Sequence, residues 1–273
     1  MFLISALALL LGAGAFAFAL RSWRRIQLLR SHFDMHVRTT EDLNRLVDHC
    51  LRTSALLPPV SERAPVEKLS FSQHGEDVIA WNLLGRPRSG FFFEAGAHDG
   101  KTLSNTFLLE AMGWTGLLVE AHPDLAEHCK RSRPKSHVVH AALGIDGGPE
   151  FCEFQMVRGA EGVDALSFSV AADSHRQRIL REGGKLETVS VPCQSLNQLL
   201  AEMNAPQIDF FSLDVEGAEM MVLQGFDFDR WQPKVLSVED NSNGSDTAVS
   251  NYILARGYRR ILRVACNDFY IRT

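Results

Sequence analysis

Short apolar runs that end at a glycine or an acidic residue recur along the last three quarters of the chain. Such runs, separated by longer segments with helical spacing, are typical of buried parallel strands joined by crossover helices. We expect five of them to form the centre of one sheet: residues 90–93, 116–119, 138–144, 208–213 and 235–238. The pattern therefore predicts an α/β fold with a doubly wound, mostly parallel sheet.

Capping residues and helix-ending glycines predict the remaining elements. Helices are expected at residues 75–84, 103–112, 123–132, 195–203 and 247–256, with Ser72 and Ser195 as candidate N-caps. Alternating apolar and polar positions predict strands at residues 150–157 and 186–191, and the Gly-rich segment up to about residue 167 is expected to be a loop over the site. Two last strands, at residues 258–264 and 269–272, are expected to pair as an antiparallel hairpin.

The N-terminus has a different character. Residues 1–20 contain no charged side chain and are dominated by Leu, Ala, Phe and Gly. About 20 helical residues span a bilayer core of about 30 Å, so the segment predicts a transmembrane anchor. A cleavable signal peptide is the alternative, but it would have a basic stretch before its apolar one. Arg21, Arg24 and Arg25 follow directly, and the positive-inside rule then predicts a single-pass protein whose large domain is cytoplasmic.

Between the anchor and the large domain, apolar side chains recur at three- and four-residue spacing over residues 21–57, which predicts a helical stalk. His36 and Thr40 interrupt the apolar stripe. The stripe therefore fits equally a short coiled coil, which would form a homodimer, and a helix lying on the membrane surface. Prolines make residues 58–67 a linker, and residues 68–273 are expected to form one domain.

Composition narrows the class of partner. The formal net charge is −5, and no basic stripe is interleaved with aromatic residues, so we expect no nucleic-acid substrate. The five cysteines lie far apart and form no C-x-x-C pair, which argues against a zinc site and against a paired disulfide framework. We expect free thiols.

The turn after the first apolar run is the strongest sign of a ligand site. Glu94, Gly96 and Gly100 follow that run with the spacing acidic-x-Gly-x-x-x-Gly, and glycines let the backbone approach a ligand closely. Glu120 ends the second run, at the strand tip where an acid commonly holds the hydroxyls of a nucleotide ribose. Ala142, near the end of the third run, leaves space for a flat ring against the backbone.

Several motifs follow one another in order along residues 68–273. They are SQHGED at 72–77, EAGAHDG at 94–100 with SNT at 104–106, GWTG at 113–116 with Glu120, and LDVEGAE at 213–219. In order and spacing they resemble the motifs of FkbM-like methyltransferases, which are S-adenosylmethionine-dependent enzymes of the class I methyltransferase fold. The usual Asn of the glycine turn is replaced here by His98-Asp99, so details of that turn transfer less well.

The resemblance implies a Rossmann-like, seven-stranded, mostly parallel sheet with an antiparallel C-terminal hairpin, preceded here by the anchor and stalk. It also implies S-adenosylmethionine as the cofactor and a hydroxyl group as the methyl acceptor, on a small molecule, a glycan or a lipid-linked molecule. On this resemblance we expect the cofactor to be bound by Glu94, Gly96, Gly100, Glu120 and Ala142.

The acceptor hydroxyl needs a group that takes its proton. Asp214 and Glu216 follow the fourth apolar run, at the strand tip expected to face the transferred methyl group, and either carboxylate could be this base. His74 and His98 are the alternatives, because the solution pKa of histidine lies nearer neutrality. A histidine in a polar turn is, however, more often a hydrogen-bonding loop residue.

Three other interpretations remain open at this point. Asp214, Asp240 and Asn241 supply oxygen ligands of the kind that suit Mg²⁺ or Mn²⁺, although we favour a site without a metal. An NAD-dependent enzyme is disfavoured because the dinucleotide fingerprint requires a second glycine, where this chain has His98. A catalytically inactive, membrane-tethered scaffold would not need the glycines and acids that gather at the strand tips.

Overall fold

The computed structural model describes residues 70–158, 185–242 and 244–273. The chain divides into two compact units, Met1–Arg63 and Ala64–Thr273, and all described residues belong to the second. The expected anchor, stalk and linker, and the loop expected before residue 167, lie outside the described residues. Among the helices that are described, none is long and apolar enough to cross a membrane.

The centre of the domain is a seven-stranded sheet with the strand order β3-β2-β1-β7-β8-β10-β9. Its strands are β1 (Phe91–Ala95), β2 (Thr115–Glu120), β3 (His137–His140), β7 (Phe210–Leu213), β8 (Val235–Glu239), β9 (Tyr258–Val264) and β10 (Asn267–Arg272). The first five are parallel, and β10 is antiparallel to both β8 and β9. The expected seven-stranded sheet with an antiparallel C-terminal hairpin is confirmed.

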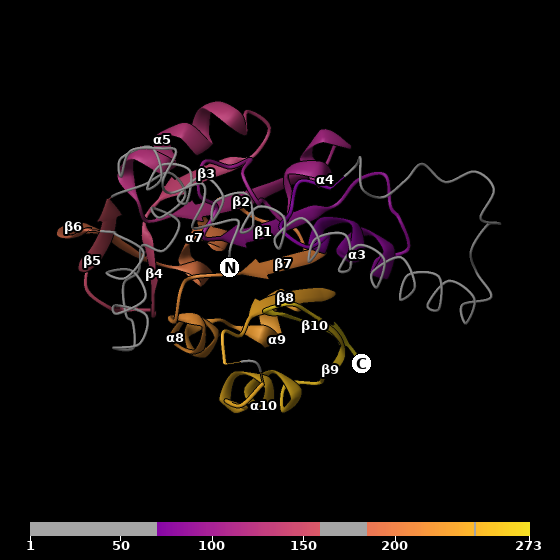
Figure 1. Cartoon of the computed structure of the whole chain (residues 1–273). Coiled ribbons are helices and arrows are strands. Elements are labelled where there is room, and N and C mark those ends of the chain that lie inside the picture. Colours follow the sequence, from indigo (N-terminus) through magenta and orange to yellow (C-terminus); the bar gives the residue numbers. More distant parts are fainter. Residues whose placement is uncertain (1–69, 159–184, 243) are drawn as a thin grey trace, which may run out of the picture. The chain divides into compact units, whose positions relative to one another are not determined.

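Helices cover both faces of this sheet. They are α3 (Glu76–Leu83), α4 (Phe107–Ala111), α5 (Pro123–Ser132), α7 (Leu196–Glu202), α8 (Glu219–Gly225), α9 (Phe228–Trp231) and α10 (Ala248–Leu254). In Figure 1, α4 and α5 lie above the central strands and α8 and α10 lie below them. Alternate strand residues such as Phe93, Phe211 and Leu236 pack with Leu200 of α7 and Leu223 of α8 in the larger core. The sheet is therefore doubly wound.

The prediction of one strand over residues 138–144 is wrong. Residues 138–144 are divided between β3 and the short β4 (Ala142–Gly144), which belongs to a second sheet with the order β4-β6-β5. The backbone leaves the large sheet at Ala141, whose N–H donates to the carbonyl of Glu120, and β4 then pairs with β6. The other two strands, β5 (Phe151–Arg158) and β6 (Lys185–Ser195), pair antiparallel, and β6 is longer than expected.

Two helix starts also differ from the prediction. Gly75, with φ of 88°, occupies the N-cap position of α3. Ser72 lies further upstream, where its hydroxyl donates to the Asp77 carboxylate and accepts the backbone N–H of Asp77 at 3.4 Å. Helix α4 begins at Phe107 because the residues before it bind the Glu94 carboxylate instead of forming a helical turn. Ser195 does cap α7, as predicted, by accepting the N–H of Gln198. The described cysteines are free, as expected.

Candidate active site

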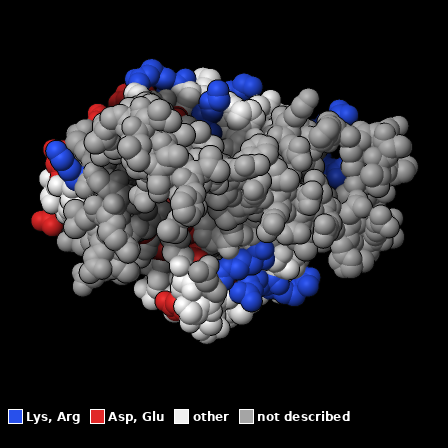
Figure 2. Space-filling view, viewed as in Figure 1, with Lys and Arg blue, Asp and Glu red and all other residues white. Residues whose placement is uncertain are grey.

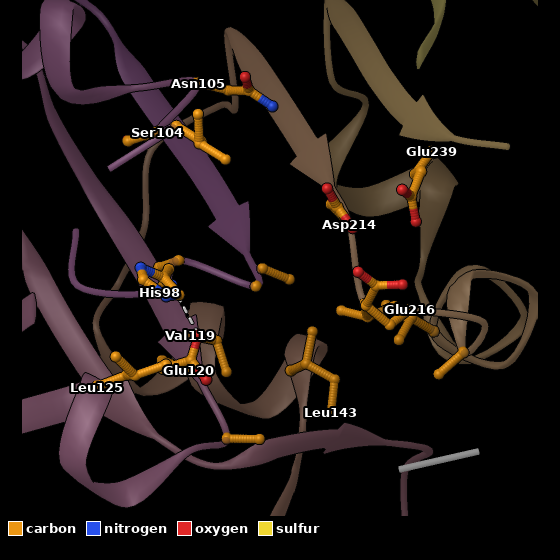
Figure 3. Close-up of a pocket in the computed structure, with 18 of the residues that line it drawn as sticks. His98, Ser104, Asn105, Val119, Glu120, Leu125, Leu143, Asp214, Glu216 and Glu239 are labelled. Atoms are coloured by element: carbon orange, nitrogen blue, oxygen red, sulfur yellow. Dashed lines mark hydrogen bonds between the residues drawn. The ribbon is translucent and has the colours of Figure 1, made fainter. Parts of the chain in front are cut away.

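A cavity of about 380 Å³ opens at the carboxyl ends of the parallel strands. It lies where the strand order reverses, since the chain runs outward from β1 to β3 and then returns to β7 on the other side of β1. Open α/β sheets bind their ligands at this switch point. Figure 3 shows His98 and Glu120 on one side of the cavity and Asp214, Glu216 and Glu239 on the other.

The glycine turn forms the floor of the cavity between these two sides. Gly96 has φ of +75°, and a Cβ added there would lie 1.8 Å from the backbone oxygen of Asp214. The turn after β1 and the turn after β7 can therefore approach each other only because residue 96 has no side chain. The N–H of Gly96 donates to the carbonyl of Val119, which fixes the turn to β2.

Glu120 lines the cavity at the tip of β2. Its two carboxylate oxygens accept the backbone N–H groups of His98 and His122, each at 2.7 Å. Burial raises the pKa of this carboxyl to about 7, although the backbone hydrogen bonds oppose the shift. Each oxygen has a further lone pair, so the carboxylate could accept ribose hydroxyls without losing its backbone contacts.

Small and apolar residues form the wall beside Glu120. Ala141, Ala142, Leu143, Leu125 and Phe154 line this part of the cavity. Ala142 therefore lies on the wall where the sequence suggested a flat ring.

Glu94 does not lie on the cavity wall. Its neighbours in β1, Phe93 and Ala95, face the core that contains α7 and α8, so the Glu94 side chain points to the opposite face. There its carboxylate accepts the N–H of Asn105 and the hydroxyl of Ser104. Glu94 therefore holds Ser104 and Asn105, which line the cavity, and is not itself among the lining residues.

A buried arginine completes this structural network. Arg133 is 1% exposed and donates to the Glu110 carboxylate at 2.9 Å, to the Gly100 carbonyl at 2.9 Å and to the Thr106 hydroxyl at 2.9 Å. The guanidinium also lies 3.6 Å from the Glu94 carboxylate. Gly100 likewise packs against α5, since a Cβ there would lie 2.7 Å from the Arg133 side chain. The second glycine of the turn thus serves packing, away from the cavity.

The acidic side of the cavity brings three carboxyl groups together. One oxygen each of Asp214, Glu219 and Glu239 lie within 4.8 Å of one another. Glu219 is held by the N–H groups of Val215 and Gly217, both at 3.1 Å, while Asp214 and Glu239 are hydrogen-bonded to each other. Burial raises the pKa of Asp214 to about 6. Burial and the Asp214 carboxylate raise the pKa of Glu239 well above neutrality, so the pair shares one proton at neutral pH.

Of the four expected base candidates, the structure brings Asp214, Glu216 and His98 to the cavity wall. Glu216 has φ of 51°, an uncommon conformation for a residue other than glycine, in the turn between β7 and α8. His74 is not among the lining residues. Its backbone N–H donates to the Glu76 carboxylate at 2.7 Å, so this residue shapes the loop before α3.

The lining residues that the sequence did not single out include three polar ones, Glu76, Glu239 and Asn267. Glu76, at the start of α3, is fully buried, and one of its oxygens accepts the side-chain amide of Asn267 at 2.9 Å. The interaction joins α3 to the start of β10, 191 residues further along the chain. No local pattern in the sequence signals such a contact.

The oxygen-ligand set considered for a metal is not assembled. The Asp240 carboxylate accepts the N–H groups of Ser242 and Gly244 and pairs with Arg263 at 2.6 Å. These interactions lower the pKa of Asp240 despite its partial burial, and they hold its carboxylate in its own turn. The acid that meets Asp214 is Glu239, one residue earlier.

Comparison with known proteins found similar solved structures and one matching family model. No curated protein matches the chain. Solved structures with a similar fold include a TehB-like SAM-dependent methyltransferase from Corynebacterium glutamicum (TM-score 0.39, 11% identity, covering 72% of this chain and 88% of that one). They also include precorrin-6y C5,15-methyltransferase from Geobacter metallireducens (TM-score 0.38, 11% identity, covering 76% of this chain and 95% of that one). A third is an O-methyltransferase from Bacillus cereus in complex with SAH (TM-score 0.32, 11% identity, covering 86% of this chain and 89% of that one). These similarities are too low to transfer a residue role or a substrate.

The family comparison is specific. The model of the methyltransferase FkbM domain matches residues 94–260, from the glycine turn to the middle of β9, and so spans more than half of the chain. The match includes the turn after β1, the tip of β2 and the acidic turn after β7, whose motifs carry the resemblance in the sequence. The chain belongs to the FkbM methyltransferase domain family.

Proposed function

We propose that the protein transfers the methyl group of S-adenosylmethionine to a hydroxyl group of a glycan, a glycolipid or a secondary metabolite. The family accounts for methyl transfer and for S-adenosylmethionine as the cofactor. The hydroxyl acceptor, the residue roles and the attachment to a membrane are the proposal.

The cofactor fits the cavity in one direction. The carboxylate of Glu120 accepts the ribose hydroxyls, and the wall that includes Ala142 and Leu143 receives the adenine ring. The methionine part then extends along the turn that contains Gly96. This direction leads the sulfonium toward Asp214, because β1 and β7 are neighbours in the sheet.

The spacing of the strands sets the distance between Glu120 and the acidic side of the cavity. Glu120 ends β2 and Glu239 ends β8, and β1 and β7 lie between them. Three strand intervals of about 4.8 Å separate the two acids by roughly 14 Å. An extended nucleoside with a short side chain therefore reaches from Glu120 to the acidic side of the cavity. The proposal rests on one observation: Glu120, the acid expected to hold the ribose, and the acidic side lie at opposite ends of one cavity.

Methyl transfer needs positioning more than chemical activation. A lone pair of the acceptor oxygen forms the new C–O bond, and the C–S bond breaks with its electrons on sulfur, which leaves S-adenosylhomocysteine. Holding the two reactants in line can supply on the order of 7–11 kcal/mol in the best cases. The hydroxyl proton passes to Asp214, the ionised member of the hydrogen-bonded pair, or to Glu216, with a typical gain of about 10² to 10⁴ in rate. His98 remains an alternative base.

The two competing functions have distinct signatures. An NAD-dependent enzyme would bind NAD and not S-adenosylmethionine, and an inactive scaffold would transfer no methyl group even if it binds the cofactor. The proposed reaction is tested by mass spectrometry of the glycolipid fraction of the host with and without the gene. We expect one molecule to lose the mass of a methylene unit when the gene is removed, and an unchanged fraction would count against a glycolipid acceptor.

The anchor expected at residues 1–20 would hold this site next to a membrane. It predicts that the full-length protein stays with membranes through carbonate washing and that protease reaches its C-terminus only from the cytoplasmic side. A mature chain that begins near Arg21 would instead show a cleaved signal peptide and would overturn the cytoplasmic assignment.

A further inference from the structure

Leu103 is an exposed apolar residue on the cavity wall. It is 51% exposed and lies in the segment between β1 and α4. Figure 2 shows Lys and Arg gathered along the top and at the lower right of the described surface. Among the described residues, large apolar side chains are exposed at five positions: Phe71, Leu103, Ile145, Phe151 and Leu254. Of these five, Leu103 alone lines the cavity, so its side chain is available to a ligand there.

The backbone of Leu103 is held in an uncommon conformation. Its φ is 58°, in the left-handed region that a bulky residue rarely adopts. Before it, the Asp99 carboxylate accepts the N–H of Thr102 at 2.6 Å. After it, the Glu94 carboxylate accepts the N–H of Asn105 at 2.8 Å. Hydrogen bonds on both sides thus fix position 103 in a conformation that glycine or asparagine would adopt at lower cost.

Residues in this conformation gather at the cavity. Among the described residues other than glycine, His98, Leu103 and Glu216 have positive φ and line it. Backbone strain of this kind clusters at ligand sites, where the surrounding structure holds a side chain in the place that function needs. Leu103 is half exposed, so burial in the core does not account for a leucine at this position. The turn does not require one either, which leaves contact with a ligand.

The acceptor is the ligand that Leu103 suits. Glu120 and Ala142, which we propose to receive the ribose and the adenine, are 7% and 6% exposed, so the nucleoside end of the cavity is more enclosed than Leu103. Leu103 therefore lies nearer the opening, where the acceptor enters. The methionine part of the cofactor ends in an ammonium and a carboxylate group, and a leucine side chain offers neither a charge nor a hydrogen bond to them.

We propose that Leu103 selects acceptors whose methylated hydroxyl is flanked by hydrocarbon, as in a deoxy sugar or a polyketide alcohol, over fully hydroxylated sugars. This inference rests on the proposed function. The leucine side chain covers the C–H groups beside the hydroxyl, and this contact removes apolar surface of both molecules from water. A hydroxyl group in the same place would lose its hydration against a side chain that cannot form a hydrogen bond in exchange.

Two probe alcohols of equal ring size test this selection. Cyclohexanol carries one hydroxyl flanked by CH₂ groups, and myo-inositol carries a hydroxyl on every ring carbon. Each is added to the full-length protein with tritium-labelled S-adenosylmethionine and an extract of the source organism, and the labelling of the acceptor in the extract is measured. We expect cyclohexanol to inhibit this labelling at a concentration at least fivefold lower than myo-inositol does.

Substitution of Leu103 separates contact with the acceptor from effects on the fold and on the cofactor. Leu103→Asn removes the apolar side chain and suits the left-handed conformation, so the Tm should stay within about 2 °C or rise. The Kd for S-adenosylmethionine should stay within twofold. The kcat/KM for labelling should fall at least fivefold, which corresponds to about 1 kcal/mol of apolar contact, and the preference for cyclohexanol should disappear.

Two further variants serve as controls. Leu103→Met keeps an apolar side chain and should retain at least half of the parent kcat/KM. Ala265 has φ of 49° and is exposed in the turn between β9 and β10, away from the cavity lining. Ala265→Gly should therefore change neither the labelling nor the Kd for S-adenosylmethionine.

A difference of less than fivefold between the two alcohols, or unchanged labelling by Leu103→Asn, would overturn the inference. So would a loss of cofactor affinity in that variant, which would place Leu103 in the cofactor site, or a Tm lowered by more than about 4 °C, which would show a packing role. If the parent protein does not bind S-adenosylmethionine, or binds it and labels no molecule, the proposed function itself is wrong. If the parent labels an acceptor without the preference for cyclohexanol, the function stands and the selection by Leu103 is wrong.

Discussion

Glu94 offers the sharpest distinction between a residue that binds the cofactor and one that supports the fold. Glu94 is 4% exposed, and its carboxylate accepts hydrogen bonds from the Ser104 hydroxyl and the Asn105 N–H, in the segment between β1 and α4. It also lies 3.6 Å from the guanidinium of Arg133. In Glu94→Gln the charge is lost, and the amide nitrogen faces hydroxyl donors that previously had an acceptor.

The expected cost follows from these contacts. Breaking a buried ion pair by removing one charged partner costs about 3–5 kcal/mol when the other charge is left without a partner. Arg133 keeps Glu110 at 2.9 Å in this variant, so we expect the lower end, about 3 kcal/mol. For a domain of 150–250 residues, each kcal/mol lowers the Tm by about 2–4 °C, so the Tm should fall by roughly 6–12 °C. Since Glu94 does not line the cavity, the Kd for S-adenosylmethionine measured well below the new Tm should stay within about twofold.

Thermal unfolding and calorimetry on the purified full-length protein measure the two effects. Glu127→Gln is the control, since Glu127 forms an exposed pair with Lys130 at 2.7 Å, and it should leave the Tm unchanged. If Glu94→Gln keeps its Tm and loses affinity for the cofactor, Glu94 belongs to the binding site and the structural network is assigned wrongly.

Three further outcomes follow from the site. Gly96→Ala should destabilise the protein by several kcal/mol and abolish cofactor binding. The control Gly147→Ala, also at positive φ but with open space around it, should cost only about 1–3 kcal/mol of stability. Equal costs would refute the close approach of Gly96 to Asp214. Affinity for S-adenosylmethionine should rise about tenfold from pH 6 to pH 8, because the ribose hydroxyls need Glu120 ionised and its pKa is about 7; Glu120→Gln should flatten this profile in calorimetry. In the protein without cofactor, the raised pKa of Glu120 acts in the opposite sense: the free energy of unfolding should decrease as the pH rises through 7. Methyl transfer should persist in EDTA, and loss of activity with recovery on adding Mg²⁺ would show that Asp214, Glu219 and Glu239 hold a cation.

Much of the fold could be predicted from the sequence because its central strands are buried on both faces. Apolar runs bounded by glycines and acids identify β1, β2, β7 and β8, and α5 has the predicted bounds. The third run was misjudged because an uninterrupted apolar segment does not reveal where the backbone leaves one sheet for another. Hydrogen bonds between Ala141 and Glu120, and the pairing of β4 with β6, decide that point.

The site was less accessible to sequence reasoning, for two physical reasons. Consecutive acids such as Glu239 and Asp240 point in different directions, and only the partners of each side chain determine which one meets Asp214. Glu76 lines the cavity next to Asn267, with which it forms a hydrogen bond although the two residues are 191 positions apart in the sequence. For Glu94 a local signal did exist, since strand alternation with Phe93 and Ala95 already directs its side chain to the face away from α7 and α8.

The central claim is that the cavity at the strand tips binds S-adenosylmethionine with its ribose on Glu120. Titration of the full-length protein with S-adenosylmethionine in a calorimeter, for the parent and for Glu120→Ala, tests it most directly. Loss of a charge-assisted hydrogen bond is worth about 1.5–3 kcal/mol, so the variant should bind at least about tenfold more weakly while NAD binds neither protein. Equal affinity of parent and variant, or binding of NAD in place of S-adenosylmethionine, would contradict the account.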